Sequence, residues 1–229
     1  MVIDYSEGVK IMGVGFQAYQ SVRNKILNLE LHFGERLNIE SLCKEIRVSP
    51  TPLREAIRKL TEDGLVRYVP RKGYYVYSPT ASDIREIYEF RKMLECYALS
   101  FINGRSVDFR AFEEVKKRIE SIQKQSDKKK RQLFVKTEDI HILILRMVDN
   151  RRIKDAYQRL SNYIHLFQHI IQRGKIEEYI EDHLNLAKAV FNRDASRARR
   201  IVEKHVSAAA DDLCKILALS DSHQNHQGP

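Results

Sequence analysis

Glycine and proline are distributed very unevenly along this chain of 229 residues. Residues 1–79 contain six of the nine glycines and four of the five prolines, whereas residues 80–220 contain no proline and only Gly104 and Gly174. Because these two residue types are the strongest local breakers of regular structure, so long a stretch with so few of them is typical of helices joined by short turns. The distribution therefore predicts a mainly α-helical protein.

The same distribution places a domain boundary at the stretch SPTASD, where Ser82 is able to cap the helix that follows. We expect a first domain over residues 1–79, of which 1–15 form an N-terminal extension, then a helical domain over residues 80–219 and a polar tail over residues 220–229. The apolar periodicity of the second domain predicts helices at residues 81–102, 107–125, 128–148, 150–172, 175–192 and 194–217.

The net charge of +9 points to anionic partners such as nucleic acid, a membrane surface or phosphorylated ligands. The three cysteines are widely spaced and form no C-x-x-C motif, so they predict free thiols in a reducing compartment rather than disulfides or a thiolate zinc site. No apolar run reaches the ~18 residues that span a bilayer, and the first residues lack a signal-peptide pattern. We therefore expect a cytoplasmic protein that does not enter a membrane.

The first domain has the element order of a winged helix-turn-helix. Helices are predicted at residues 16–29 and 39–46, and a third helix begins at the stretch SPTP, where Ser49 or Thr51 can act as N-cap. The third helix buries one apolar face and stops at Gly64. The stretch VRYV-PRKG-YYVY then alternates around a turn, which predicts a two-stranded hairpin.

Positive charge gathers on the third helix and the hairpin tip of this domain. The side of the helix away from its apolar stripe carries Thr51, Arg54 and Arg58, and the hairpin tip carries Arg71 and Lys72. An arginine can bind a phosphate or a guanine edge through two parallel hydrogen bonds, which suits a helix in the major groove with a wing on the backbone. The pattern therefore predicts binding to double-stranded DNA.

The stretch GERLNIESLCKEIRVSPTPLREAIRKLTEDGLVRYVPRKGYYV resembles the DNA-binding domain of GntR-type bacterial transcription regulators, through its VS-x-TP-x-REA-x-x-x-L-x-x-x-GLV string. The stretch TASDIREIYEFRKMLECYA similarly resembles the start of the all-helical FCD effector domain of the FadR-like branch. The resemblance implies DNA contacts at Ser49, Thr51, Arg54, Arg71, Lys72 and Gly73.

Three positions depart from the family pattern. Pro50 and Glu40 stand where the family often has arginine, which leaves the operator sequence open. Arg47 replaces the usual glycine of the turn before the third helix, and we expect it to add a phosphate contact.

Three histidines of the second domain, His141, His183 and His205, lie on apolar faces of three different predicted helices. Imidazole is the commonest protein ligand for transition metals, so the three predict a shared internal site. The resemblance implies a metal ligated by an aspartate and three such histidines, but Thr137 occupies the aspartate position, and Glu138 is the neighbouring carboxylate able to replace it. We expect zinc, nickel or manganese, with a polar pocket lacking metal as the alternative.

Arg91 and Glu95 interrupt the apolar stripe of the first helix of this domain. Charged residues on a buried face must be paired or must line a polar cavity. One interpretation is a simple ion pair one turn apart; the other, which the resemblance implies, places Arg91, Glu95 and Thr137 in an effector pocket that holds a carboxylate.

Together these patterns predict a homodimeric regulator, without enzymatic activity, that binds an operator with inverted half-sites and represses transcription. A small effector, held by the helical domain directly or through the metal, would shift the population of DNA-competent states. The alternatives are a metalloenzyme with a three-histidine site, against which no H-E-x-x-H motif occurs, and a non-specific nucleic-acid-binding protein.

Overall fold

The computed structural model describes residues 13–104, 107–126, 129–130, 133, 140–171 and 176–224, with the backbone alone at 168–171 and 219–224. The chain divides into two compact units. Unit 1 comprises Met1–Pro79 and Ser161–His169, and unit 2 comprises Thr80–Leu160 and Ile170–Pro229. The second unit is therefore not one uninterrupted stretch of chain, because Ser161–His169 groups with the first.

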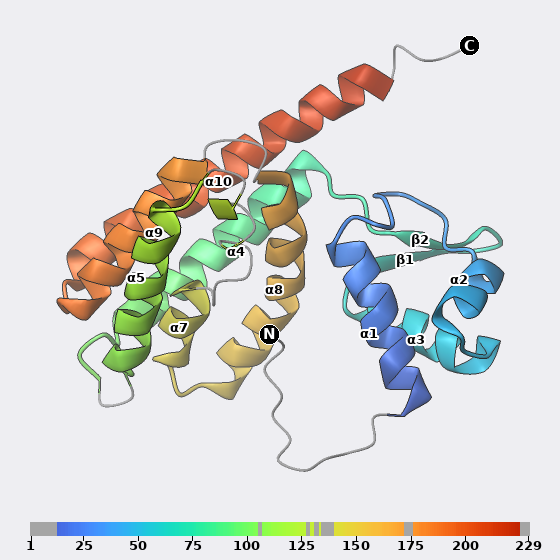
Figure 1. Cartoon of the computed structure of the whole chain (residues 1–229), viewed down its shortest axis with the longest axis horizontal. Coiled ribbons are helices and arrows are strands. Elements are labelled where there is room, and N and C mark those ends of the chain that lie inside the picture. The colour runs from blue at the N-terminus through green and yellow to red at the C-terminus, as the bar shows by residue number, and fades with distance from the viewer. Residues whose placement is uncertain are drawn as a thin grey trace. The chain divides into compact units, whose positions relative to one another are not determined.

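Unit 1 contains a three-helix core and a hairpin, labelled in Figure 1 as α1 (Val14–Leu27), α2 (Ile39–Ile46), α3 (Pro50–Glu62), β1 (Val66–Val69) and β2 (Gly73–Val76). α3 packs against both α1 and α2. The core side chains are Ala18, Val22, Ile26, Leu42, Leu53, Ala56, Ile57 and Leu60. The strands are antiparallel, with Val66 opposite Val76 and Val69 opposite Gly73. The predicted winged helix-turn-helix order is confirmed.

Local signals in the sequence fix the ends of α2 and α3. The Asn38 side chain caps α2 by accepting a hydrogen bond from the Ser41 backbone N–H at 3.0 Å. Ser49, rather than Thr51, is the N-cap of α3, and a proline follows it at the first helical position. α3 ends at Glu62, and Gly64 continues the chain at a φ of +78°, a backbone conformation that glycine adopts without a Cβ penalty.

Unit 2 is helical, which together with unit 1 confirms the mainly α fold class. Its helices are α4 (Ala81–Leu99), α5 (Phe109–Gln123), α7 (Ile140–Arg146), α9 (Ile176–Phe191) and α10 (Ala195–Gln224). The residues of one further helix, α8 (Arg151–Ile171), are divided between the two units. α4 packs against α10 and α7, and α9 packs against α5 and α10 (Figure 1). Within the described part of the chain, no helix is long and apolar enough to cross a membrane.

The start of α4 differs from the prediction, because Thr80 and not Ser82 is its N-cap. The Thr80 hydroxyl accepts from the Asp83 backbone N–H at 3.1 Å, and the Thr80 backbone N–H donates to the Asp83 carboxylate at 2.8 Å. This reciprocal pair is a capping box. Ser82 lies inside the first turn, where its hydroxyl instead contacts Glu86 at 3.1 Å.

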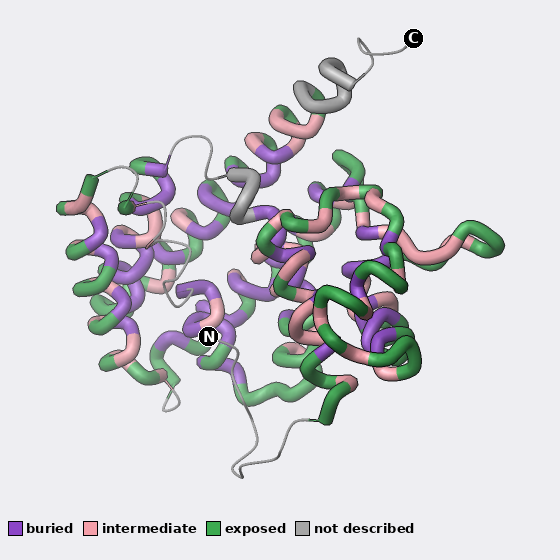
Figure 2. Tube along the Cα trace, turned by 45° about the vertical axis from the view of Figure 1, so that its right-hand side comes forward, coloured by how far each residue is buried: buried purple, intermediate pink, exposed green. Residues whose placement is uncertain are grey.

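The buried residues of unit 2 lie on the faces that its helices turn toward one another, and exposed residues occupy the outer sides (Figure 2). Most are aliphatic or aromatic, as the periodicity predicted. Charged and polar side chains are nevertheless buried at Arg91, Glu95, His141 and His205. Because charge and hydrogen-bonding groups are costly to bury without partners, these residues identify the part of the core whose composition packing alone does not explain.

Candidate functional site

The solvent-facing side of α3 carries the residues expected to contact DNA. Thr51, Arg54 and Arg58 are exposed, whereas Leu53 and Ile57 on the opposite side are fully buried. Ser49 caps the helix through its backbone alone, because its side chain makes no capping hydrogen bond, and its hydroxyl faces solvent. α3 therefore offers hydroxyl and guanidinium donors on one accessible face, as a helix that reads base edges requires.

Arg58 and Arg47 have specific local geometry. The Arg58 guanidinium donates to the Glu62 carboxylate at 2.7 Å, but both side chains are well exposed, so the pair is weak and able to open. Arg47 ends α2 in the left-handed region, at a φ of 61° and a ψ of 46°. The left-handed conformation costs a residue with a Cβ about 1–2 kcal/mol. Arg47 is exposed and occupies the turn directly before α3.

The hairpin presents a second basic edge at its tip. Arg71 and Lys72 are exposed, and the Lys72 backbone N–H closes the turn by donating to the Val69 carbonyl at 3.1 Å. Gly73 has a φ of +109°, and a Cβ there would lie 3.6 Å from Arg36 Nε. Gly73 therefore serves the shape of the wing, because only glycine adopts this conformation without strain.

Sequence reasoning missed two further arginines of the wing. Arg67 is exposed on β1 and lies opposite Tyr75, while Arg36 is exposed and forms an isolated antiparallel bridge to the same tyrosine. Arg67 directly follows the buried Val66 on β1, and because neighbouring side chains of a strand point to opposite faces, that position was a signal able to find it. Arg36 precedes α2 by sequence, and only the tertiary structure brings it to the hairpin.

Unit 2 brings the three predicted histidines together from α7, α9 and α10. One potential ligand atom from each of His141, His183 and His205 lies within 4.8 Å of the other two. Their ring centroids are 5.0 Å apart for His141 and His183, 5.3 Å for His141 and His205, and 4.6 Å for His183 and His205. Ligand atoms this close can share one ion.

Each imidazole in this cluster has its Nδ1 held by an oxygen. His183 Nδ1 lies 2.6 Å from the Tyr179 carbonyl, His205 Nδ1 lies 3.2 Å from Asp182 Oδ2, and His141 Nδ1 lies 2.5 Å from Glu95 Oε2. A carbonyl oxygen only accepts, so Nδ1 of His183 carries the proton. Metal-binding histidines typically donate one ring N–H to a carbonyl or carboxylate, which fixes the tautomer and leaves Nε2 as the ligand atom.

Glu95 joins the cluster to the buried arginine. Its Oε1 accepts from Arg91 Nε at 2.7 Å, while its other oxygen contacts His141. The structure thus contains the ion pair one turn apart that the sequence left as one of two interpretations, and it adds a role as the support of His141. Glu95 is fully buried and Arg91 is 4% exposed, so this network lies within the core of unit 2.

The electrostatics of the site favour neutral imidazole at His183. Burial lowers its pKa well below the usual value, and the neighbouring His205 and His141 lower it further. Burial also raises the pKa of Glu95, which the Arg91 guanidinium opposes by stabilising the carboxylate. A neutral histidine is the form that coordinates a metal, and a carboxylate is the form that accepts from both Arg91 and His141.

The donor set fits a divalent transition metal at the three histidines. Two expected members of the site, Thr137 and Glu138, lie outside the described residues, so their positions stay predictions. Sequence reasoning missed Asp182 and the Tyr179 carbonyl. Asp182 could have been found, because it directly precedes the predicted ligand His183. A contact to a backbone carbonyl, such as that of Tyr179, leaves no signal in a sequence.

The comparisons with known proteins agree with both units. The family model for bacterial regulatory proteins of the gntR family matches residues 16–76, and the model of the FCD domain matches residues 86–208. Similar curated proteins cover most of the chain. An HTH-type transcriptional regulator of Bacillus subtilis, YdhC, itself uncharacterised, is 28% identical over 88% of this chain and 91% of its own length. The HTH-type transcriptional repressor RspR of Escherichia coli is 23% identical over 89% and 90%.

Solved structures share the fold. A GntR transcriptional regulator of Rhodococcus sp. RHA1 superimposes with a TM-score of 0.71 at 21% identity, covering 87% of this chain and 96% of that one. McbR/YncC of Escherichia coli gives 0.70 at 16% identity, covering 90% and 99%. An exposed helix-turn-helix surface, a helical unit with a histidine cluster and matches over both regions lead to one conclusion. The chain belongs to the gntR family of bacterial regulatory proteins and is a transcriptional regulator with a DNA-binding winged helix-turn-helix and an FCD domain.

Proposed function

We propose that this regulator acts as a homodimeric repressor whose FCD domain holds a divalent transition metal and senses a small carboxylate. The proposal has three parts: how DNA is read, what occupancy of DNA does, and what the helical unit binds. The observation that carries the third part is the histidine cluster of unit 2, in which every Nδ1 already has an oxygen partner.

The basic residues of unit 1 support the first part. Arg54 is exposed on α3 and has no ion pair within the part of the chain that the structure describes, so its guanidinium is available for a base edge or phosphate. Lys72 at the wing tip suits a phosphate. One such unit reads a few base pairs, so a dimer with two-fold symmetry gives an operator of two inverted half-sites.

Repression is the expected result of binding. A protein seated on an operator blocks polymerase without further contacts, whereas activation needs an additional surface. The names of two similar proteins support repression over activation: they are the HTH-type transcriptional repressors RspR and GlaR of Escherichia coli.

Three imidazoles held in the ligating tautomer support a metal, with zinc, nickel or manganese as the candidates. Such an ion, when bound, would leave coordination positions for a small carboxylate, and a ligand that binds one conformation better than the other would shift the DNA-competent population. Arg91 donates to Glu95 through Nε and so supports His141 through that carboxylate, and we expect the same guanidinium to contact the carboxylate of the effector.

The decisive experiment is elemental analysis of the full chain, purified without chelator or a metal-affinity tag. We expect close to one equivalent of a transition metal, and loss of that metal in His183→Ala. His32→Ala is the matched control, because His32 is exposed in unit 1 and distant in sequence from the cluster. Adding metal to the stripped protein should raise its melting temperature, and this gain should be lost in acid, since protonated imidazole does not coordinate. Because burial lowers the pKa of His183 well below its usual value, the loss should begin at a pH below that at which an ordinary imidazole protonates, about 6.5.

A different result would redirect the proposal. The wild-type chain could retain less than about a tenth of an equivalent of metal, and zinc, nickel and manganese could leave its melting temperature unchanged, although an ion that binds the folded state raises it. With both results, the histidines form a polar pocket that binds its effector without metal. The DNA part is tested separately, by fluorescence anisotropy with operator and with scrambled duplex of equal length.

A further inference from the structure

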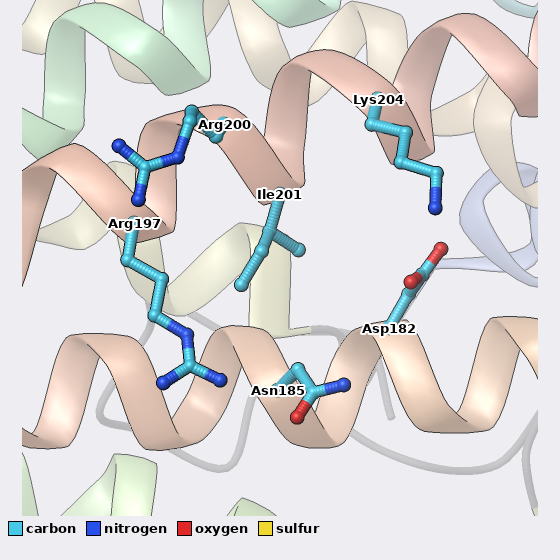
Figure 3. Close-up of a pocket in the computed structure, with 6 residues that line it drawn as sticks. All are labelled: Asp182, Asn185, Arg197, Arg200, Ile201 and Lys204. Carbon is cyan, nitrogen blue, oxygen red and sulfur yellow. The ribbon is translucent and has the colours of Figure 1, made fainter.

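A groove on the surface of unit 2 lies between α9 and α10 (Figure 3), and the three clustered histidines are not among the residues that line it. It has a volume of about 370 Å³ and is lined by Asp182, Asn185, Arg197, Arg200, Ile201 and Lys204. Ligand pockets in proteins typically measure about 300–1,000 Å³, so the groove is large enough for a small metabolite.

The α10 side of the groove is strongly basic. Arg197, Arg200 and Lys204 are spaced three and four residues apart, which places them on one side of a helix. All three side chains are exposed, and none forms an ion pair within 4.0 Å among the residues that the structure describes. Asp182, the carboxylate that lines the groove, contacts His205 Nδ1 at 3.2 Å. The groove thus concentrates positive charge that the described chain leaves unneutralised.

The α9 side supplies hydrogen-bonding groups of a different kind. In Figure 3, Arg197 extends from α10 toward Asn185 on α9, Lys204 extends toward Asp182, and Ile201 lies between them. One end of the groove therefore combines a guanidinium with an amide, and the other combines an ammonium with a carboxylate. A ligand that fits both ends carries an anionic group at the first and a hydroxyl donor at the second.

We infer that this groove binds a small phosphorylated metabolite, with the phosphate at Arg197 and Asn185 and a hydroxyl group of the ligand donating to Asp182. Arg200 lies on α10 at the same end of the groove and adds positive charge there. Guanidinium groups match phosphate oxygens through paired, charge-assisted hydrogen bonds, and phosphate carries enough charge to attract three cations. A monoanionic carboxylate of similar size neutralises less of this charge and offers fewer acceptor oxygens.

The groove also touches the support of the histidine cluster, because Asp182 lines it and accepts from His205 Nδ1 at 3.2 Å. This second step rests on the proposed metal site. A bound phosphate adds negative charge near a cation site, so it favours the metal, and by linkage the metal favours phosphate equally. Phosphate binding itself needs no metal, which keeps the two proposals separable.

The test is a calorimetric titration of the full, metal-free chain in chelator, with inorganic phosphate, glycerol phosphate and glycerol as probes. We expect both phosphates to bind, glycerol phosphate more tightly, and glycerol alone not to bind. Arg197→Gln should raise the dissociation constant for phosphate by about fivefold or more, because it removes charge-assisted hydrogen bonds. Arg200→Gln should raise it by about twofold, because it removes positive charge from the same end of the groove.

Two control variants exclude simpler explanations. Arg110→Gln, in an exposed position on α5, removes the same charge away from the groove and should leave phosphate binding unchanged. Arg54→Gln removes a charge from α3, and a loss of phosphate binding in that variant would assign the phosphate to the DNA-reading helix and overturn the inference. Arg197 and Arg200 are exposed, so their variants should keep the wild-type helical content by circular dichroism.

The inference is overturned if no heat of binding is found up to about 20 mM phosphate, a range that covers even weak ligands. Equal loss in the Arg110→Gln control, or wild-type affinity in both groove variants, would also overturn it. So would a loss of operator affinity in Arg197→Gln, which would assign the groove to nucleic acid. In metal-loaded protein, saturating phosphate should lower the dissociation constant of the metal by about twofold to fivefold. If that constant alone stays unchanged, only the coupling through Asp182 is contradicted.

Discussion

The DNA-reading surface of unit 1 and the histidine cluster of unit 2 are built on opposite principles. On α3 and the wing, the side chains of Arg54, Arg71 and Lys72 are exposed to solvent. In unit 2, His141 and Glu95 are both fully buried and contact one another. The first region presents separate groups to an outside partner, whereas the second encloses groups that fix one another.

The two regions should differ in whether the effects of single substitutions add. Exposed side chains that share no contacts contribute nearly independently to binding, so their effects add. Buried groups in one hydrogen-bonded network do not, because removing a member leaves its partners buried without a bond. The substitutions below test whether the two regions differ in this way.

The largest effect is expected at His205. His205→Ala should reduce bound metal to below about a tenth of an equivalent, because the two remaining imidazoles bind a divalent ion too weakly to retain it at neutral pH. The double variant His183→Ala with His205→Ala should lose no more than either single one, as measured by elemental analysis and competition with a chelator. A double variant that loses much more than each single one would mean that the histidines act separately.

The second effect is expected at Arg54. Arg54→Ala should weaken operator binding by about 1–3 kcal/mol, the range for a base contact, and relax discrimination against a scrambled duplex. The side chain is exposed, so helical content and metal content should stay at the wild-type values. Anisotropy at fixed salt measures this, and unchanged operator affinity would remove α3 from its assigned role.

A smaller loss is expected when only the support of a ligand changes. Glu95→Gln keeps the size of the side chain and one acceptor oxygen, but it removes the charge that pairs with Arg91 and orients His141. Metal affinity should fall by about tenfold, the lower end for a residue that contacts a ligand and not the ion. Glu89→Gln, in an exposed position on the same helix, is the control. Equal metal affinity in the two variants would contradict a supporting role for Glu95.

The smallest effect is expected at the wing. Lys72→Ala should weaken binding by a similar, few-fold factor for operator and scrambled DNA, and should reduce the slope of log affinity against log salt by about 0.9, as expected for one phosphate contact. Combined with Arg54→Ala, the losses in free energy should add to within about 0.5 kcal/mol. Strong non-additivity there would erase the contrast between the exposed and the buried region.

Much of the fold was predictable because its signals are local. The helix of residues 39–46 was predicted with the bounds that α2 has, and the apolar face of α3 follows from side chains that recur with the helical period. The cap of α4 was assigned to the wrong residue because Thr80 and Ser82 carry equivalent hydroxyl groups. The choice depends on where the backbone turns from extended to helical.

The site was predictable to a lesser extent. The histidines were found because polar residues on apolar stripes need an explanation, and the structure places all three in one cluster. Their partners could not be found in that way. Asp182 contacts His205 because two helices pack side by side, and His183 contacts a backbone carbonyl, that of Tyr179. No spacing rule connects Glu95 on α4 with His141 on α7.

The sequence by itself determined the helical character, the winged helix-turn-helix order, the basic face of α3 and the three histidines, since each depends on residue type and on spacing within one element. The tertiary structure alone decided which oxygen holds each imidazole, that Arg91 and His141 share the carboxylate of Glu95, that Arg36 joins the wing, and that three cations of α10 face a groove beside Asp182. Hydrogen bonds between elements act over about 3 Å, and the positions of elements far apart in the chain are set only when the whole core packs.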